Sequence, residues 1–231
     1  MLVAFTVFVM AAVAYVYLGE GLVTASIMCI NVLLAGLVAF DFFEPLADAI
    51  ANQFSGSSFA DYADTICLIG LFALTLGLLR LATNTLQPLQ LELQGAVQSL
   101  GGAAFGLVTG YLVAGFLICV FQTLPLPVNF LGFDPAYEAT AGLRNYLPAD
   151  RVWLGLMQFA GAHGLSNGDD ESRNLPVLPD ELTNRRIDGT PTFDKYGTFE
   201  MRYARYRRYG DNRDPTVYSG EFGAELAGPA R

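Results

Sequence analysis

Four long apolar runs constrain the fold of this chain more than any other feature of its sequence. Each run is close to the roughly 20 residues that a helix needs to cross the hydrocarbon core of a bilayer. Only a helix or a closed barrel can cross that core, because every backbone N–H and C=O group must find a partner inside the protein. The predicted membrane-spanning helices cover residues 2–18, 22–40, 65–83 and 100–121, and they contain one charged residue, Arg80.

The charged residues are unevenly distributed along the chain. Of 13 lysine and arginine residues only Arg80 precedes residue 144, and the whole chain has a net charge of -9. Nucleic acid is therefore not an expected partner, because phosphate binding requires clustered positive charge. A content of 53% hydrophobic and 15% charged residues instead favours a lipid bilayer as the surroundings of the first half. We predict an all-α integral membrane protein with a four-helix transmembrane domain over residues 1–124 and a largely irregular, polar C-terminal tail over residues 125–231.

Short polar breaks separate the predicted spans. Residues 19–21, Gly-Glu-Gly, form a tight turn after the first span, and so short a connection predicts that the first two helices are antiparallel neighbours. The second span is expected to end at Asp41, before a separate short amphipathic helix at the start of residues 44–63. A further amphipathic segment, residues 86–98, is expected to lie in the plane of the membrane interface.

The polar tail is expected to contain one helix and one strand. Residues 149–165 have the pattern of an amphipathic helix, in which Trp153 is suited to a membrane surface. One apolar side of this helix consists of Val152, Leu156 and Phe159. A strand is expected near residues 198–209, where arginines alternate with tyrosines. This alternation fits a solvated strand or contact with lipid headgroups better than nucleic-acid binding.

The sequence contains no pattern typical of catalysis or metal binding. Cys29, Cys67 and Cys119 lie inside apolar runs and are expected to be packed free thiols. With the single histidine, His163, they lack the paired spacing of a tetrahedral metal site. The predicted spans contain neither paired carboxylates nor a nucleophile beside a base. We therefore expect no metal, no cofactor and no enzymatic activity.

The fourth span carries the most specific pattern in the chain. Small residues repeat there at four-residue spacing, which places them on one face of the helix. These residues are Gly102, Gly106, Gly110 and Ala114. In lipid, small residues let two helix backbones approach closely enough to associate by van der Waals packing. A helix-packing face is therefore predicted, either against another helix of the same chain or against another copy.

Few polar or ionisable residues lie in or near the predicted spans. Glu20, Asp41 and Arg80 lie at the predicted ends of spans, where water or headgroups reach them, and are interpreted as membrane-interface charges. Asn31 is an intramembrane polar residue in the middle of the second span. Its amide needs a partner, which we expect to be a backbone carbonyl or a hydroxyl such as that of Thr75 on another helix.

Taken together, these residues resemble the colicin V production protein family, also called CvpA-like, over about residues 1–122. The likeness rests on the turn at residues 19–21, on the second span with Gly36 and its Phe-Phe-Glu-Pro exit, on the third span, and above all on the glycine pattern of residues 100–110. The resemblance implies a bacterial inner-membrane protein that is required for colicin V production or export, or for envelope homeostasis, with no established chemistry. It also suggests a likeness to the membrane helices of small mechanosensitive channels.

Two functions are consistent with these features. In the first, a non-enzymatic multi-pass membrane protein self-associates through the glycine face of its fourth helix, or binds other membrane proteins, and supports toxin export. In the second, the same helix surrounds the pore of an oligomeric channel. Arg80 is the single basic residue near the short turns, which predicts that the turns after the first and third helices lie in the cytoplasm and both termini outside. A cleaved signal peptide is disfavoured, because no basic residue precedes the first apolar run.

Overall fold

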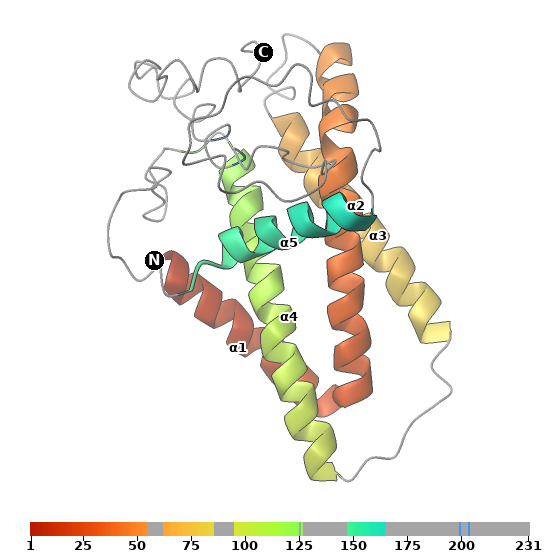
Figure 1. Cartoon of the computed structure of the whole chain (residues 1–231), viewed down its shortest axis with the longest axis vertical. Helices are drawn as coiled ribbons and strands as arrows, with labels where there is room; N and C mark the ends of the chain where they lie inside the picture. Colours follow the sequence, from red (N-terminus) through yellow and green to blue (C-terminus); the bar gives the residue numbers. More distant parts are fainter. Residues whose placement is uncertain are drawn as a thin grey trace.

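The computed structural model describes residues 1–54, 62–85, 95–124, 126, 147–164, 199 and 203. Within these residues the chain forms helices α1 (Leu2–Glu20), α2 (Leu22–Gln53), α3 (Ala63–Thr85), α4 (Gly95–Thr123) and α5 (Ala149–Gly164), and it forms no strand. Helices α1 to α4 run lengthwise through the molecule, while α5 crosses α4 and α2 at a steep angle (Figure 1). The predicted all-α class is confirmed.

Helices α1 to α4 are each long and apolar enough to span a membrane. They contain the four predicted spans, and they leave large apolar side chains such as Phe8, Leu74 and Leu100 exposed on the outer surface. A surface of this kind is stable in lipid, where no water competes for the helix backbone and apolar side chains match the solvent. The molecule is therefore a multi-pass membrane protein.

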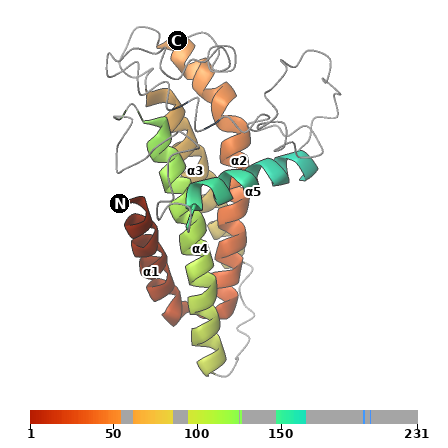
Figure 2. The same cartoon turned by 60° about the vertical axis from the view of Figure 1, so that its left-hand side comes forward.

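Helix α4 is the central helix of the membrane domain. It packs against α1 on one side and α2 on the other, and α3 packs mainly against α2. Figure 2 shows α4 between α1 and α2. Helices α1 and α2 run in opposite directions, as predicted (Figure 1), but they are not packed neighbours, because α1 makes only minor contact with α2 and lies along α4. The physical reason is that the glycine face of α4 lets the backbones of α1 and α4 approach each other closely.

A single residue, Gly21, connects α1 to α2. Its φ of 90° is a backbone conformation that glycine adopts readily and other residues rarely adopt. The Gly21 N–H donates to the carbonyl of Tyr17 at 3.4 Å, and the Gly21 carbonyl accepts from the N–H of Ala25 at 3.1 Å. A Cβ at Gly21 would also lie 2.7 Å from Nε2 of Gln98 on α4. The turn is thus tighter than the predicted turn over residues 19–21.

Helix α2 is 32 residues long and continues through Pro45. The predictions that the helix ends at Asp41 and that a separate amphipathic helix follows are therefore wrong, because both segments form one long helix. Its buried face crosses the proline without a break. This face consists of Ala35, Ala39, Phe43 and Ala47, all 0% exposed. Packing of this face outweighs the cost of about 3 kcal/mol of a proline inside a helix. At about 1.5 Å per residue, α2 is longer than the hydrocarbon core of a bilayer is thick.

The core lies where α2, α3, α4 and α5 meet. Its centre is an aromatic cluster in which the ring of Phe40 lies 6.2 Å from that of Phe116 and 6.1 Å from that of Trp153. The ring of Phe72 stacks on Phe116 at a centroid distance of 3.9 Å. The same core also includes the three free, buried cysteines, which were predicted to be packed thiols: Cys29, Cys67 and Cys119.

Two predicted segments lie largely outside the described residues. Of the amphipathic segment 86–98, the structure describes only residues from 95 onward, which form the first turn of α4. Of the strand near residues 198–209, it describes Phe199 and Tyr203, and both have helical backbone. These two residues are buried, and the ring of Phe199 lies 5.8 Å from that of Phe40.

Candidate functional site

The glycine face of α4 packs against α1 of the same chain. The face consists of Gly102, Gly106, Gly110 and Ala114, all of them buried. A Cβ on Gly106 would lie 2.8 Å from the Cα of Ala14, and a Cβ on Gly110 would lie 2.7 Å from the Cα of Met10. These contacts are with backbone atoms, which cannot move aside as a flexible side chain can. The absence of side chains on α4 is therefore what lets the two helices pack at this distance.

This packing is the first of the two uses predicted for the glycine face, contact with another helix of the same chain. Helix α1 covers the face within one chain, so a second copy could reach Gly106 only after α1 had left α4. Within one chain the face joins α4 to α1, and self-association of the chain through this face stays a prediction. The tight spacing was visible in the sequence, but the identity of the partner helix depends on the tertiary arrangement.

The intramembrane Asn31 joins α2 to α3. Its Nδ2 donates a hydrogen bond of 3.2 Å to Oγ1 of Thr83, which in turn donates to the carbonyl of Leu79 at 2.9 Å. The predicted kind of partner, a hydroxyl on another helix, is confirmed, but the residue is Thr83 and not Thr75, which lies about two helical turns earlier in α3. Thr75 and Thr83 share one face of α3, and the sequence alone does not reveal how far α3 is shifted along α2. The interaction connects two helices and offers no open site.

The three predicted interface charges occupy different environments. Glu20 is the last residue of α1 and is exposed, and Arg80 lies near the end of α3 and is exposed. Asp41 does not lie at a helix end, because α2 continues to Gln53. It is partly buried at the point where the uncharged part of α2 gives way to an acidic part. No described contact joins these charges into one site with Asn31.

The most distinctive contact in the described structure lies where α5 crosses α2 and α4. Trp153 of α5 is completely buried, and a Cβ on Gly36 of α2 would overlap its ring atoms Cζ2 and Cη2. A Cβ on Gly115 of α4 would overlap the carbonyl oxygen of Ala149 and lie 2.9 Å from the Cβ of Trp153. We call this pair of glycines, Gly36 and Gly115, the α5 notch. The missing side chains of the notch leave room for an indole ring.

The position of Trp153 corrects one expectation. Trp153 was expected at the membrane surface, whereas its ring is buried in the protein and Val152, Leu156 and Phe159 face outward. The two glycines of the notch lie far apart in the sequence. Only the crossing of α2, α4 and α5 brings them together beneath one indole. Gly36 belongs to the family resemblance, but its sequence context predicts no role for it, and nothing local marks Gly115, which directly follows the glycine face.

A buried polar contact fixes the first turn of α5 to the end of α4. Nε2 of Gln122 donates to Oδ2 of Asp150 at 3.1 Å, and these residues are 1% and 2% exposed. Beside them, the hydroxyls of Thr65 and Thr123 lie 2.9 Å apart and join α3 to α4. Because the Thr123 hydroxyl donates to the carbonyl of Val120, Thr65 is the donor in this pair. A carboxylate in the first turn of a helix is also stabilised by the helix dipole.

We expect Gln122→Leu to lower the free energy of unfolding by about 1–3 kcal/mol, because it removes a hydrogen bond from a buried carboxylate. Thermal unfolding of the purified protein in detergent measures this change. Gln53→Leu is the matched control, since Gln53 is exposed at the end of α2 and should change the stability by less than about 0.5 kcal/mol. Equal stabilities of the two variants would contradict the structural role of the Gln122–Asp150 contact.

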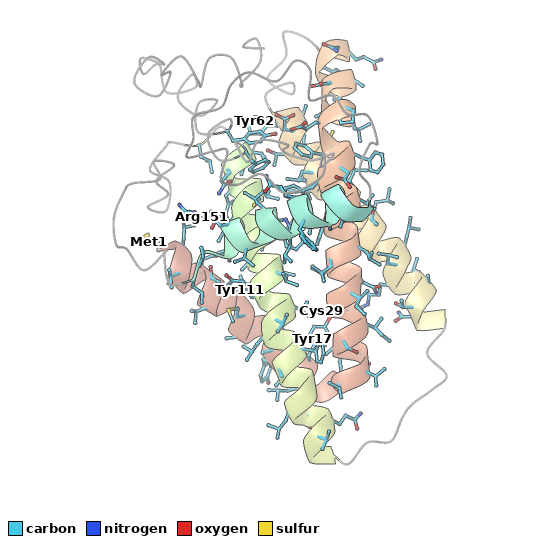
Figure 3. The ribbon with its side chains drawn as sticks, in the orientation of Figure 1. Met1, Tyr17, Cys29, Tyr62, Tyr111 and Arg151 are labelled. Carbon is cyan, nitrogen blue, oxygen red and sulfur yellow. The ribbon has the colours of Figure 1, made fainter. Side chains whose placement is uncertain are left out.

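Labelled side chains on both sides of α5 show where this helix crosses the molecule along its length. Figure 3 shows Arg151 at the first turn of α5, with Tyr62 beyond α5 on one side and Cys29 and Tyr17 on the other. Within the described residues, no group of three or more His, Cys, Asp or Glu side chains is positioned to hold a metal ion. The contacts at this crossing join helices to one another. They define a multi-pass α-helical membrane protein with a crossing helix docked on its core.

A family model for the colicin V production protein matches residues 3–140. The match covers more than half of the chain and includes α1 to α4 in almost their full length, while α5 lies beyond it. The chain therefore belongs to the colicin V production protein family, which confirms the resemblance. No curated protein and no solved structure gives a significant match to the chain.

Proposed function

We propose that this protein is a non-enzymatic factor of the bacterial inner membrane that is required for colicin V production or export and for envelope homeostasis. The observation that carries this proposal is the family match over residues 3–140, which includes all four helices able to span a membrane. A non-enzymatic role is supported by the use of buried polar groups. Asn31, Thr65 and Gln122 each bond to a neighbouring helix.

A scaffold role is supported by the surfaces that the fold leaves uncovered. Helices α1 and α3 are the least buried of the four potential spans, at 17% and 22% of their most apolar windows. We place contacts with other membrane proteins, or with further copies of the chain, on these two outer helices. Contacts through the glycine face of α4 are less well supported, because α1 would first have to leave that face.

An oligomeric channel is the alternative function, and the arrangement of the helices supports it less. A pore lined by the glycine face of α4 would require α1 to move away, because α1 now packs on that face. It would also require α4 to leave its central position between α1 and α2. Conductance of the purified protein in a planar bilayer under tension would favour the channel, and silence of folded protein would favour the scaffold.

The proposed function predicts genetic complementation. In a colicin V producer that lacks its own family member, expression of this chain is expected to restore the zone of killing around colonies on a sensitive lawn. Restored growth on detergent would report envelope homeostasis in the same strain. A chain that reaches the inner membrane in normal amount, but restores neither phenotype, would contradict the proposal.

A further inference from the structure

Helix α5 carries large apolar side chains on two faces, of which one is buried and the other is partly exposed. The buried face carries Trp153 and Met157, which lie in the core. The neighbouring face carries Val152, Leu156 and Phe159, which are 40%, 37% and 56% exposed. Their spacing places them along one edge of the helix, which we call the outer edge of α5. Large apolar side chains that stay partly exposed along one edge favour an apolar environment around that edge.

The α5 notch fixes the depth of this helix along α2. Gly36 lies five residues before Asp41, the first acidic residue of α2, which corresponds to about 7.5 Å along a helix axis. Beyond this point α2 carries Asp41, Glu44 and Asp48, while between Leu22 and Gly36 it carries no charge at all. The crossing point therefore lies on the apolar side of the boundary between lipid-compatible and water-compatible sequence.

The sequence of α4 is compatible with the same depth. It carries no charged residue over its whole length, and Gly115 lies seven residues before the buried Gln122, or about 10 Å along the axis. Helices α2 and α4 run in the same direction (Figure 1). Amphipathic helices that lie in the membrane plane are buried about 5–10 Å into the boundary between headgroups and acyl chains. The notch holds α5 at a comparable distance below the first acidic residue of α2.

We propose that α5 is an in-plane membrane helix whose outer edge is embedded among the lipid acyl chains of one leaflet. Its crossing direction fits this position, because a helix at a steep angle to the spans lies close to the plane of the bilayer (Figures 1 and 2). The exposed side chains of α2 next to this level, Leu34 and Phe42, are also large and apolar. The outer edge thus continues the lipid-facing surface of the spans. This inference does not depend on a role in toxin production.

The chain offers a direct test, because Trp153 is its single tryptophan. In a Trp153→Phe background, Phe159→Trp places the only fluorophore on the outer edge of α5. Phe54→Trp in the same background is the matched control, since Phe54 is exposed just after α2, 18 residues beyond the notch. Both proteins are placed in phosphatidylcholine nanodiscs whose acyl chains carry bromine near the headgroup.

Brominated lipid is expected to quench most of the emission of Phe159→Trp and little of the emission of Phe54→Trp. Aqueous iodide is expected to give the opposite order. Quenching of Phe159→Trp by iodide and not by brominated lipid would overturn the proposal. Protection of Phe159→Trp from both quenchers would also overturn it, because the edge would then be covered by a second copy of the protein.

A second pair of variants keeps Trp153 in place and therefore preserves the packing of the core. Leu156→Cys and Asn52→Cys each carry a nitroxide label, and the native thiols are buried away from the reagent. The label at residue 156 is expected to collide with dissolved oxygen more than with a water-soluble nickel chelate. The label at residue 52 should show the reverse. Preference of residue 156 for the nickel chelate would contradict an embedded outer edge.

Discussion

Replacing Gly106 with leucine is expected to separate α1 from α4 and to destabilise the protein by about 3 kcal/mol, at the upper end of the range for overpacked sites. Even a Cβ at this position would lie 2.8 Å from the Cα of Ala14 and 3.3 Å from the carbonyl oxygen of Val13. A leucine adds three more carbon atoms to a contact made with backbone. The helices can accept it only by moving apart.

The separation is measured by disulfide formation between cysteines at positions 5 and 121, in a protein whose native cysteines are replaced. The rings of Phe5 and Phe121 lie 5.6 Å apart across the α1–α4 contact. Gly77→Leu is the matched control, because a Cβ on Gly77 meets nothing within 4 Å, and leucine should slightly favour the helix. If Gly106→Leu and Gly77→Leu formed the disulfide equally well, the proposed role of the glycine face would be refuted.

Replacing Trp153 with alanine is expected to release α5 from the notch and to lower the free energy of unfolding by about 3–5 kcal/mol. Trp153 is the largest of the fully buried side chains described. Its ring also makes edge-on contacts with Phe40 at 6.1 Å and with Phe116 at 5.9 Å, which would be lost with it. Thermal unfolding in detergent and the rate of proteolysis within residues 147–164 measure the effect. Phe159→Ala is the control for loss of an aromatic ring from an exposed position.

Gly36 provides a test of whether the effect comes from the notch itself. Gly36→Ala alone is expected to destabilise the protein, because its Cβ would overlap the ring of Trp153. In a Trp153→Ala background the same change should be neutral or stabilising, since the ring is gone and alanine favours a helix over glycine by about 1 kcal/mol. Additive effects of the two changes would show that Gly36 and Trp153 do not act on one another.

The parts of the fold that depend on local sequence were predictable. Uncharged runs of helical length predict membrane spans, because the bilayer allows few alternatives. The repeat from Gly102 to Gly110 predicts a close helix contact, because small residues on one face let two backbones approach. The same local signals misled at Pro45, where a helix break was expected. The buried face that carries α2 past the proline is visible only when the partner helices are in place.

The parts that depend on which helices meet were not predictable. Asn31 required a partner, but choosing Thr83 over Thr75 needs the position of α3 along α2 to within two turns. The amphipathic pattern of the tail helix identified its apolar residues without showing that Trp153 faces the protein. The orientation of Trp153 is set by Gly36 and Gly115, which lie far from residues 149–165 in the sequence.

The order of contacts has a consequence for biogenesis. Helix α1 turns at Gly21 into α2 but packs mainly on α4, which begins only at Gly95. We therefore expect α1 to reside in the membrane without its final neighbour while α2 and α3 are still being synthesised. Its flank at Met10 and Ala14 faces acyl chains until the last of the four spans is inserted. Assembly of the membrane domain therefore finishes after translation of α4, when that span displaces lipid from α1.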